Sequence, residues 1–220
     1  MLFRSDYDTQ SSFYGTEKAC EPVHAQLNLS DGSVDLINLG EARSFKVRTL
    51  VEDLDGKTLS DQTNQVLAAA DDRTAVAKPD LATLAGKHTI LVKLEVSDAA
   101  GAPVSDNFYW WAADEASFRE LNSLPPATLS VSAASAPANG ERAVTVRIKN
   151  TGSAAALMIK LTLNDAATGQ RILPAYYSDN YVSLLPGEER TVTVTFAAGG
   201  AKPEIGVRGW NLATQTFTVQ

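Results

Sequence analysis

The chain has 220 residues, and its 19 basic against 26 acidic side chains give a formal net charge of −7. This acidity argues against binding to a nucleic-acid backbone, which needs a basic face, and against adsorption to anionic lipid. Hydrophobic residues make up 44% of the chain and charged residues 20%, which excludes a disordered protein and is typical of a globular one. The length allows one or two domains, each with its own core.

The scarce cysteine and histidine residues limit the chemistry that the chain can perform. Cys20 is the only cysteine, so an intrachain disulfide is excluded, and we expect Cys20 to be a buried packing residue because Lys18 is the only cation beside it. We expect His24 and His88 to be ordinary surface or edge residues. No apolar run approaches the roughly 18 residues of a membrane span, and the polar, mixed-charge residues 1–20 do not resemble a signal peptide.

The first segment, residues 1–21, is short, polar and aromatic, and it favours a helix. Phe13, Glu17 and Cys20 share one face at the helical spacing of three and four residues. Pro22 ends any such helix, because proline removes a backbone donor and restricts the residue before it. A helix this short is marginal on its own in water, and we expect the segment to be the remnant of something larger.

From Val23 onward the apolar residues alternate with polar ones, which is typical of strands with one buried face. Dipeptides such as Asp31-Gly32 and Asp55-Gly56 predict turns between the strands, because glycine adopts a positive φ without strain. The expected strands cover 24–29, 34–39, 45–54, 58–67, 89–96 and 104–111. This spacing predicts a β-sandwich that is immunoglobulin-like in architecture only, since the Cys–Trp–Cys pattern is absent.

A second set of strands follows a proline-rich boundary. We expect one or two helical turns over 116–121, and Pro125-Pro126 then makes a semi-rigid joint. Asn139-Gly140 predicts a further hairpin turn. The second set of expected strands covers 128–133, 143–150, 157–164, 190–196, 204–210 and 214–219. The sequence therefore predicts an all-β fold of two tandem immunoglobulin-like sandwiches, divided into 1–21, 22–113, a linker at 114–126, and 127–220.

Carboxylates are the first place to look for catalysis or metal binding. A glycosidase needs two carboxylates held about 5 to 10 Å apart, one of them in a setting that shifts its pKa. The acidic groups of the sequence instead fall in expected turns or on exposed faces, which favours simple solvation. The groups concerned are Glu52/Asp53/Asp55, Asp71/Asp72 and Glu188/Glu189. Asp71, Asp72 and Asp80 lack the spacing of a calcium loop, so we expect no metal site, and we expect no cofactor.

Tryptophans form the first aromatic group, in the stretch Asn107–Trp111. Trp110 and Trp111 are neighbours on an expected strand and so face opposite sides of the sheet. We expect one of them to fill the core and the other to be partly exposed or to lie in a domain interface. Exposed aromatic rings also stack on sugars, but the core or interface interpretation is favoured. Trp210 is expected to be a core anchor near the last turn.

Tyrosines form the second aromatic group. Tyr176, Tyr177 and Tyr181 are half of the six tyrosines and lie in one loop-like stretch with Asp179 and Asn180. Tyrosine offers flat area and a hydroxyl group at low entropic cost, which suits recognition. Asp179 and Asn180 could equally form a turn.

Three stretches together resemble one family of enzymes. The stretch 14–24 (YGTEKACEPVH) resembles the segment of bacterial exo-β-D-glucosaminidases that joins the catalytic (β/α)-barrel to the next Ig-like domain. The stretch 107–111 (NFYWW) resembles the last strand of that domain, and 177–188 (YSDNYVSLLPGE) resembles their final sandwich. These enzymes belong to glycoside hydrolase family two, beside the β-mannosidases, and the resemblance runs in order along the chain.

The resemblance implies a helical remnant of the barrel followed by two C-terminal Ig-like domains. The parent would be a retaining, secreted or periplasmic exo-enzyme that removes glucosamine or mannose units, and its two catalytic carboxylates would lie in the barrel, upstream of this chain. The expected partner is therefore the barrel of the same chain, and an oligosaccharide is a further candidate. The candidates for contact with barrel or sugar are Trp110, Trp111, Tyr176, Tyr177, Asp179, Asn180 and Tyr181. Two alternatives stay open: an autonomous carbohydrate-binding pair and a structural, adhesion-type Ig tandem.

Overall fold

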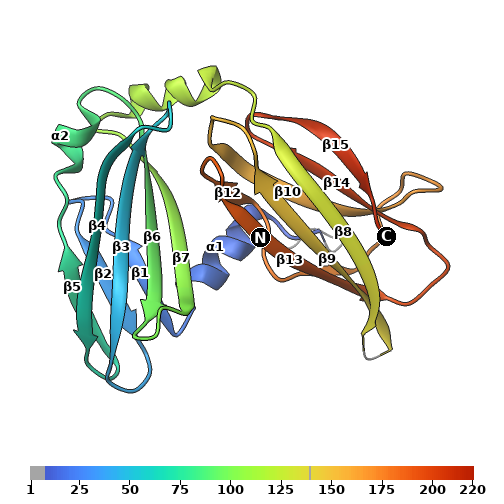
Figure 1. Cartoon of the computed structure of the whole chain (residues 1–220), viewed down its shortest axis with the longest axis horizontal. Helices are drawn as coiled ribbons and strands as arrows, with labels where there is room; N and C mark the ends of the chain where they lie inside the picture. Colours follow the sequence, from blue (N-terminus) through green and yellow to red (C-terminus); the bar gives the residue numbers. More distant parts are fainter. Residues whose placement is uncertain (1–7, 139) are drawn as a thin grey trace. The chain divides into compact units, whose positions relative to one another are not determined.

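The computed structural model describes residues 8–138 and 140–220. Over these residues the chain is mostly β, with its strands in four antiparallel sheets (Figure 1). It divides into two compact units: residues 16–124, called the first unit here, and residues 8–15 with 125–220, called the second unit. The cut between residues 15 and 16 falls inside α1 (Ser11–Ala19). None of the described helices is long and apolar enough to cross a membrane.

Two sheets build the first unit, in the strand orders β1-β2-β5 and β4-β3-β6-β7. Its elements are β1 (Val23–Leu27), β2 (Val34–Asn38), β3 (Arg43–Asp53), β4 (Thr58–Ala68), β5 (Asp72–Ala77), α2 (Leu81–Ala85), β6 (Ile90–Asp98), β7 (Pro103–Trp111) and the 3-10 helix η1 (Glu115–Ser123). Both sheets contribute to one hydrophobic core, as in a β-sandwich: Leu36 comes from one sheet, Phe45 and Val92 from the other. Two side chains join the sheets at β1 and β7, because the Tyr109 hydroxyl accepts from Leu27 N at 3.2 Å and Asn107 Nδ2 donates to Ala25 O at 2.7 Å.

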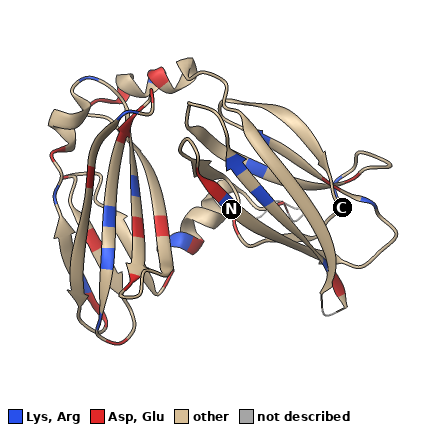
Figure 2. Ribbon diagram, in the orientation of Figure 1, with Lys and Arg blue, Asp and Glu red and all other residues tan. Residues whose placement is uncertain are grey.

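Charged residues of the first unit lie along the strands β3, β4 and β6 (Figure 2), and on β3 they alternate with the core residues Phe45 and Val47. The Arg48 guanidinium pairs with both oxygens of Asp61 at 2.8 Å and with Glu95 at 2.9 Å. These pairs are partly exposed, so we expect them to contribute little to stability.

The second unit is built the same way from the sheets β12-β10-β14-β15 and β11-β13-β9-β8. Its strands are β8 (Leu129–Ala138), β9 (Glu141–Asn150), β10 (Ala156–Asp165), β11 (Ala175–Tyr177), β12 (Val182–Leu184), β13 (Glu189–Ala197), β14 (Pro203–Gly209) and β15 (Leu212–Thr218). Val146 and Val194 of one sheet and Leu161 and Ile205 of the other meet in a separate core. Alternation in β9 and β13 gives each strand one buried face, as the sequence pattern predicts.

A buried asparagine followed two residues later by glycine recurs in both units. Asn38 donates through Nδ2 to Glu41 O and Ala69 O and accepts from Gly40 N. Asn150 does the same in the second unit, donating to Ala154 O and Leu184 O and accepting from Gly152 N. Both asparagines are fully buried, so each amide satisfies backbone groups that would otherwise lack partners inside the fold.

The expected strands agree well with the observed ones, and the elements that the sequence pattern does not predict are short. The strands expected at 104–111 and 190–196 correspond to β7 and β13, and the turn at Asp55-Gly56 joins β3 to β4 with Gly56 at φ +81°. The helical turns expected at 116–121 are η1, which begins with Asp114 accepting from Ser117 N. The pattern missed β5, α2, β11 and β12. The hairpin turn predicted at Asn139-Gly140 falls in part outside the described residues.

Two predicted environments are wrong, and a third is right only in part. Cys20 is exposed, because α1 ends at Ala19 and the cysteine follows it at the surface. His24 lies on β1, an edge strand of its sheet, as one of its two predicted environments requires, but it is buried at 5% exposure and its Nδ1 donates to Glu21 O at 2.8 Å. Trp210 is 49% exposed and no core anchor, because it occupies the tight turn between β14 and β15.

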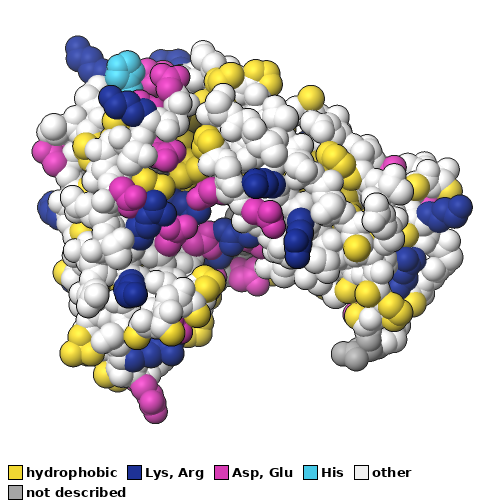
Figure 3. All heavy atoms as spheres, in the orientation of Figure 1, with side chains coloured by type: hydrophobic (Ala, Val, Ile, Leu, Met, Phe, Trp, Pro, Cys, Tyr) yellow, Lys and Arg dark blue, Asp and Glu magenta, His cyan; other side chains and the backbone are white. Residues whose placement is uncertain are grey.

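Exposed large hydrophobic side chains are few and scattered. Leu29, Leu39 and Leu67 of the first unit and Tyr176 and Trp210 of the second are each about half exposed or more. On the face drawn in Figure 3, hydrophobic side chains lie in small groups between charged and polar ones. The domain boundaries expected from the sequence stay predictions, since the units above follow compactness and cut the chain at 15/16 and 124/125.

Candidate functional site

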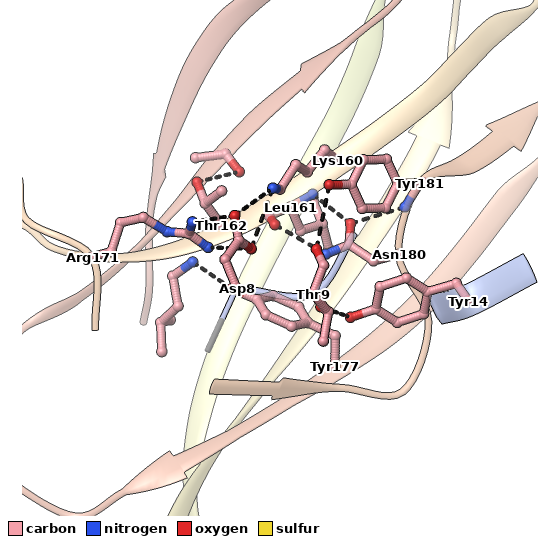
Figure 4. A network of polar contacts seen from close by, with 12 residues as sticks. Asp8, Thr9, Tyr14, Lys160, Leu161, Thr162, Arg171, Tyr177, Asn180 and Tyr181 are labelled. Atoms are coloured by element: carbon pink, nitrogen blue, oxygen red, sulfur yellow. Dashed lines mark hydrogen bonds and ion pairs between the residues drawn. The ribbon is translucent and has the colours of Figure 1, made fainter. Parts of the chain in front are cut away.

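The densest set of polar contacts that involves the predicted tyrosine stretch lies within the second unit. There the segment 8–14, which includes the first residues of α1, meets β10 and the loop that follows β11 (Figure 4). We call Asp8, Lys160, Arg171 and Tyr181 the Asp8 cluster.

Asp8 is the anion of this cluster and is buried, at 6% exposure. Arg171 holds the carboxylate with both terminal nitrogens, Nη2 at 2.9 Å from Oδ1 and Nη1 at 2.6 Å from Oδ2. Lys160 Nζ adds contacts of 2.9 Å to Oδ2 and 3.3 Å to Oδ1. The Arg171 hydrogen bonds, reinforced by Lys160, outweigh the opposing effect of burial and lower the pKa of Asp8 to about 2. The carboxylate is therefore charged at any physiological pH.

The two cations come from the sandwich itself. Lys160 belongs to β10, is 5% exposed, and lies with Nζ 5.2 Å from the centre of the Tyr181 ring, within the range of a cation–π contact. Arg171 pairs with Asn164 through an isolated β-bridge. Its pKa is raised, first by the hydrogen bond to Asp8. The Nε of Arg171 is buried and has no hydrogen-bond partner among the described residues.

Aromatic and hydroxyl groups make further contacts with the segment 8–14. The Tyr181 hydroxyl donates to Thr9 O at 3.4 Å, and its ring lies 6.0 Å from that of Tyr14. Tyr14 is 4% exposed and shares a hydrogen bond of 2.8 Å with Thr9 Oγ1. Tyr181 adopts φ +56°, which a residue with a side chain takes at a cost unless its surroundings hold it there. The geometry shows a residue fixed in a special conformation that contacts Lys160, Thr9 and Tyr14.

The loop that carries Tyr181 is fastened to the backbone of β10 by side chains. Asn180, at 4% exposure, accepts from Leu161 N at 2.8 Å through Oδ1 and donates to Leu161 O at 3.1 Å through Nδ2. The Tyr177 hydroxyl accepts from Leu163 N at 2.8 Å. Burial raises the pKa of Tyr177 to about 12, so the hydroxyl stays protonated. Two side chains thus take the place of a neighbouring strand along this edge of β10.

The tyrosine stretch is therefore divided between inward and outward residues. Tyr177, Asn180 and Tyr181 contact β10 or the segment 8–14. Asp179 lies in a bend after β11, where its Oδ1 accepts from Asn180 N at 2.8 Å, and its carboxylate lies 3.8 Å from Arg190. Tyr176 points outward at 63% exposure.

The tryptophan pair lies on β7 of the first unit. Trp111 packs against the core, and Trp110, its neighbour on the strand, takes the opposite face and is half-buried. Neither is part of the Asp8 cluster. Their contacts with a barrel or with sugar stay predictions.

The sequence pattern does not predict three residues of the site: Asp8, Lys160 and Arg171. Asp8 is separated from Lys160 by 152 positions and from Arg171 by 163. One feature of the sequence does point to Lys160, because this lysine interrupts the apolar run Leu157–Leu161. A lysine on a buried strand is stable only with an anionic partner, so its position indicates an ion pair.

The arrangement can bind and position a segment of the chain. Its single carboxylate is neutralised by two cations and its lowered pKa makes it a poor proton donor. Among the described residues, no group of three or more His, Cys, Asp or Glu could hold a metal ion.

Comparison with known proteins shows which class of domain the later part of the chain resembles. Residues 107–212 match the model of the exo-β-D-glucosaminidase Ig-fold domain. The resemblance that the sequence motifs indicate is thus confirmed.

Curated relatives extend the likeness to nearly the whole chain. The exo-β-D-glucosaminidase of Streptomyces avermitilis is 33% identical over 95% of this chain and 26% of its own length. That of Amycolatopsis orientalis is 32% identical over 98% of this chain and 23% of its own length. A mannosylglycoprotein endo-β-mannosidase of Lilium longiflorum is 25% identical over 97% of this chain and 29% of its own length.

A solved structure agrees. The crystal structure of the exo-chitosanase of Amycolatopsis orientalis matches with a TM-score of 0.89 at 30% identity, covering 99% of this chain and 29% of that one. The chain therefore spans about a quarter of the length of the proteins it matches.

Proposed function

We propose that this chain forms non-catalytic accessory domains of a glycoside hydrolase of the exo-β-D-glucosaminidase kind. The observation that carries the proposal is the match of almost the whole chain to about a quarter of such enzymes, including their Ig-fold domain. The β-mannosidase relative supports a role common to related glycosidases.

In this role the sandwiches brace a catalytic barrel and shape one wall of its substrate entrance. The segment 8–21 would be the exit from the barrel, and α1 (Ser11–Ala19) its helical remnant. The Asp8 cluster supports a bracing role, because it joins the segment to a rigid strand by buried, charged contacts.

The carboxyl groups with a known pKa shift do not suit the role of a general acid. A general acid of a glycosidase needs a carboxyl group whose pKa is raised. The carboxyl groups Asp8, Asp31, Asp61, Asp80, Glu95, Asp114, Glu120 and Asp165 have a lowered pKa, the opposite of what a general acid needs.

The direct test compares two recombinant proteins, the 220-residue chain and the product of the whole gene, on p-nitrophenyl β-D-glucosaminide and chitosan oligomers. We expect no turnover by the chain and release of glucosamine by the whole product. A whole product that lacks a barrel, or turnover by the chain alone, would contradict the proposal.

A sugar titration separates bracing from carbohydrate binding. Tyr176 and Trp210 are the exposed rings of the second unit, at 63% and 49% exposure. We expect no binding of chitosan or mannan oligomers to the chain at millimolar concentration. Binding that is lost in Tyr176→Ala or Trp210→Ala would favour the autonomous carbohydrate-binding alternative.

A further inference from the structure

The second sandwich carries a binding surface that is complete except for an anion. Lys160 stands on β10, an interior strand of its sheet, and Arg171 is bridged to the end of the same strand. Asn180 and Tyr177 fasten the neighbouring loop, and that loop presents Tyr181 beside the two cations. Every one of these residues belongs to the 125–220 part of the unit.

Only the segment 8–14 supplies what this surface lacks. Two cations that reach the same carboxylate oxygens repel each other when no anion lies between them. With the segment in place, Lys160 is nearly inaccessible to water and so needs a charged partner. The Asp8 carboxylate lies between the two cations and reduces their repulsion, and both of its oxygens contact Arg171, a geometry that is selective for planar anions such as a carboxylate. Tyr14 and Thr9 add contacts with Tyr181. The surface therefore selects a segment in which a carboxylate, Asp8, is followed a few residues later by an aromatic ring, Tyr14.

We propose that the second sandwich is a receptor for the polypeptide segment 8–14, which it recognises through the Asp8 carboxylate and the Tyr14 ring. The segment precedes the first unit in the sequence, yet its binding site is made by residues 152 to 172 positions later. The contact therefore forms only after the last sandwich has been synthesised and folded. On the proposed function, on which this part of the inference rests, the held segment is the exit of the catalytic barrel, and the last domain secures it.

Hydrogen–deuterium exchange of the full 220-residue chain tests the recognition without any activity assay. Asp8→Asn removes the charge from the bound segment and leaves the sandwich sequence untouched, and Lys160→Met removes one cation of the receptor. We expect amides of the segment 9–19 to exchange at least about tenfold faster in both variants. Strands β9 and β13 should keep their protection. Lys149→Met is the matched control, because Lys149 is an exposed lysine on β9 of the same unit.

Two results would overturn the proposal. One is unchanged exchange of the segment in Asp8→Asn. The other is equal acceleration in the segment and in β9 and β13, which would mean that the charge supports the whole sandwich and does not hold a ligand. If Lys160→Met fails to fold, Asp8→Asn alone decides.

A peptide experiment supplies an independent measurement. A labelled peptide of residues 6–16 is titrated, by fluorescence anisotropy, into the full-length Asp8→Asn chain. We expect it to bind at least about tenfold more tightly than the same peptide with asparagine at position 8, whereas equal binding would contradict the recognition of the carboxylate. Should the whole gene prove to encode no barrel, the proposed function fails while both of these readouts remain interpretable.

Discussion

Asp8 illustrates how a single residue is controlled by partners that are remote in sequence. In water its carboxyl group would titrate near the ordinary value of 3.8, but Arg171 and Lys160 lower the pKa to about 2. Protonation of Asp8 is unfavourable because it would weaken the charge-assisted contacts that this buried carboxylate makes with Arg171 and Lys160. The effect gives the cluster a defined dependence on pH.

The pH dependence can be predicted with its sign. A carboxyl group whose pKa is lower in the folded than in the unfolded state stabilises the fold above the unfolded value, and this is lost as pH falls through the folded value. The stabilisation by Asp8 should therefore be complete above about pH 4 and vanish near pH 2, and a shift of this size corresponds to about 2 kcal/mol. Urea unfolding of the wild type and Asp8→Asn should differ at pH 5 and converge toward pH 2. Equal free energies of unfolding at pH 5 would contradict this.

Asn150 provides a second prediction at the residue scale. In Asn150→Ala the carbonyl oxygens of Ala154 and Leu184 and the amide of Gly152 lose their partner inside the fold. We expect a decrease of about 2 to 3 kcal/mol in the free energy of unfolding, measured by urea denaturation, because buried polar groups are left unsatisfied. Gln215→Ala, at an exposed position of β15, is the control and should change it by less than about 0.5 kcal/mol. A loss of the same small size in Asn150→Ala would show that water replaces the amide.

At the scale of elements, the turn between β14 and β15 explains why Trp210 stays outside. Trp210 N donates to Leu157 O at 2.8 Å, and Asn211 Oδ1 accepts from Leu157 N at 3.1 Å. The Asn211 side chain also donates to Ala155 O at 2.8 Å. These bonds bring the turn so close to β10 that Gly209 has no room for a side chain.

Gly209→Ala should therefore destabilise the second unit. An added Cβ would lie 2.8 Å from Leu157 O, a backbone atom that cannot turn aside, and 2.7 Å from Leu212 Cδ1. We expect a loss of about 1 to 3 kcal/mol and a lower melting temperature by calorimetry. Gly199→Ala serves as the comparison, since nothing lies within 4 Å of its added Cβ. Equal melting temperatures for the two variants would mean that β10 moves to make room.

Elements with a long alternating pattern could be predicted, and short ones could not. Val144, Val146 and Ile148 alternate with polar residues, so β9 follows from the sequence alone. α2 has only the five residues LATLA, too few to show a helical period, and β5 (DRTAVA) has almost no apolar face. Both are held by their neighbours: β5 pairs with β2, and Asp80 accepts from Thr83 N at the start of α2.

At the scale of the whole molecule, residues 8–138 and 140–220 form two hydrophobic cores that share no residue. Leu94 is fully buried in the core of the first unit and Leu161 in that of the second. A core is stabilised by the apolar contacts of its own side chains, so a cavity should be felt mainly in the unit that contains it.

Leu94→Ala and Leu161→Ala test this separation. Each substitution should lower the free energy of unfolding of its own unit by about 2 to 5 kcal/mol. In hydrogen exchange, Leu94→Ala should accelerate β3 and β6, and Leu161→Ala should accelerate β10 and β14. Acceleration of all these strands in either variant would show that the units unfold together.

The sequence pattern predicts only some of the residues of the candidate site. Tyr177, Asn180 and Tyr181 stood out because three tyrosines and two turn-forming side chains gather within a few positions. Asp8 and Arg171 did not, since a charged residue in a polar stretch gives no sign of a distant partner. Trp210 misled for a related reason: an aromatic residue near a turn is a core anchor or an exposed ring depending on how close the turn comes to its neighbour.

The sequence by itself determined the all-β fold, the succession of two sandwiches and the family resemblance. These features rest on local alternation, on turn residues and on short motifs, which each stretch of chain carries independently of the rest. The tertiary structure alone decided that Asp8 is held by Lys160 and Arg171, that His24 is buried and that Trp210 is exposed. The reason is physical: charge pairing and burial depend on which segments the closed fold brings together, and in the Asp8 cluster those segments lie more than 150 residues apart.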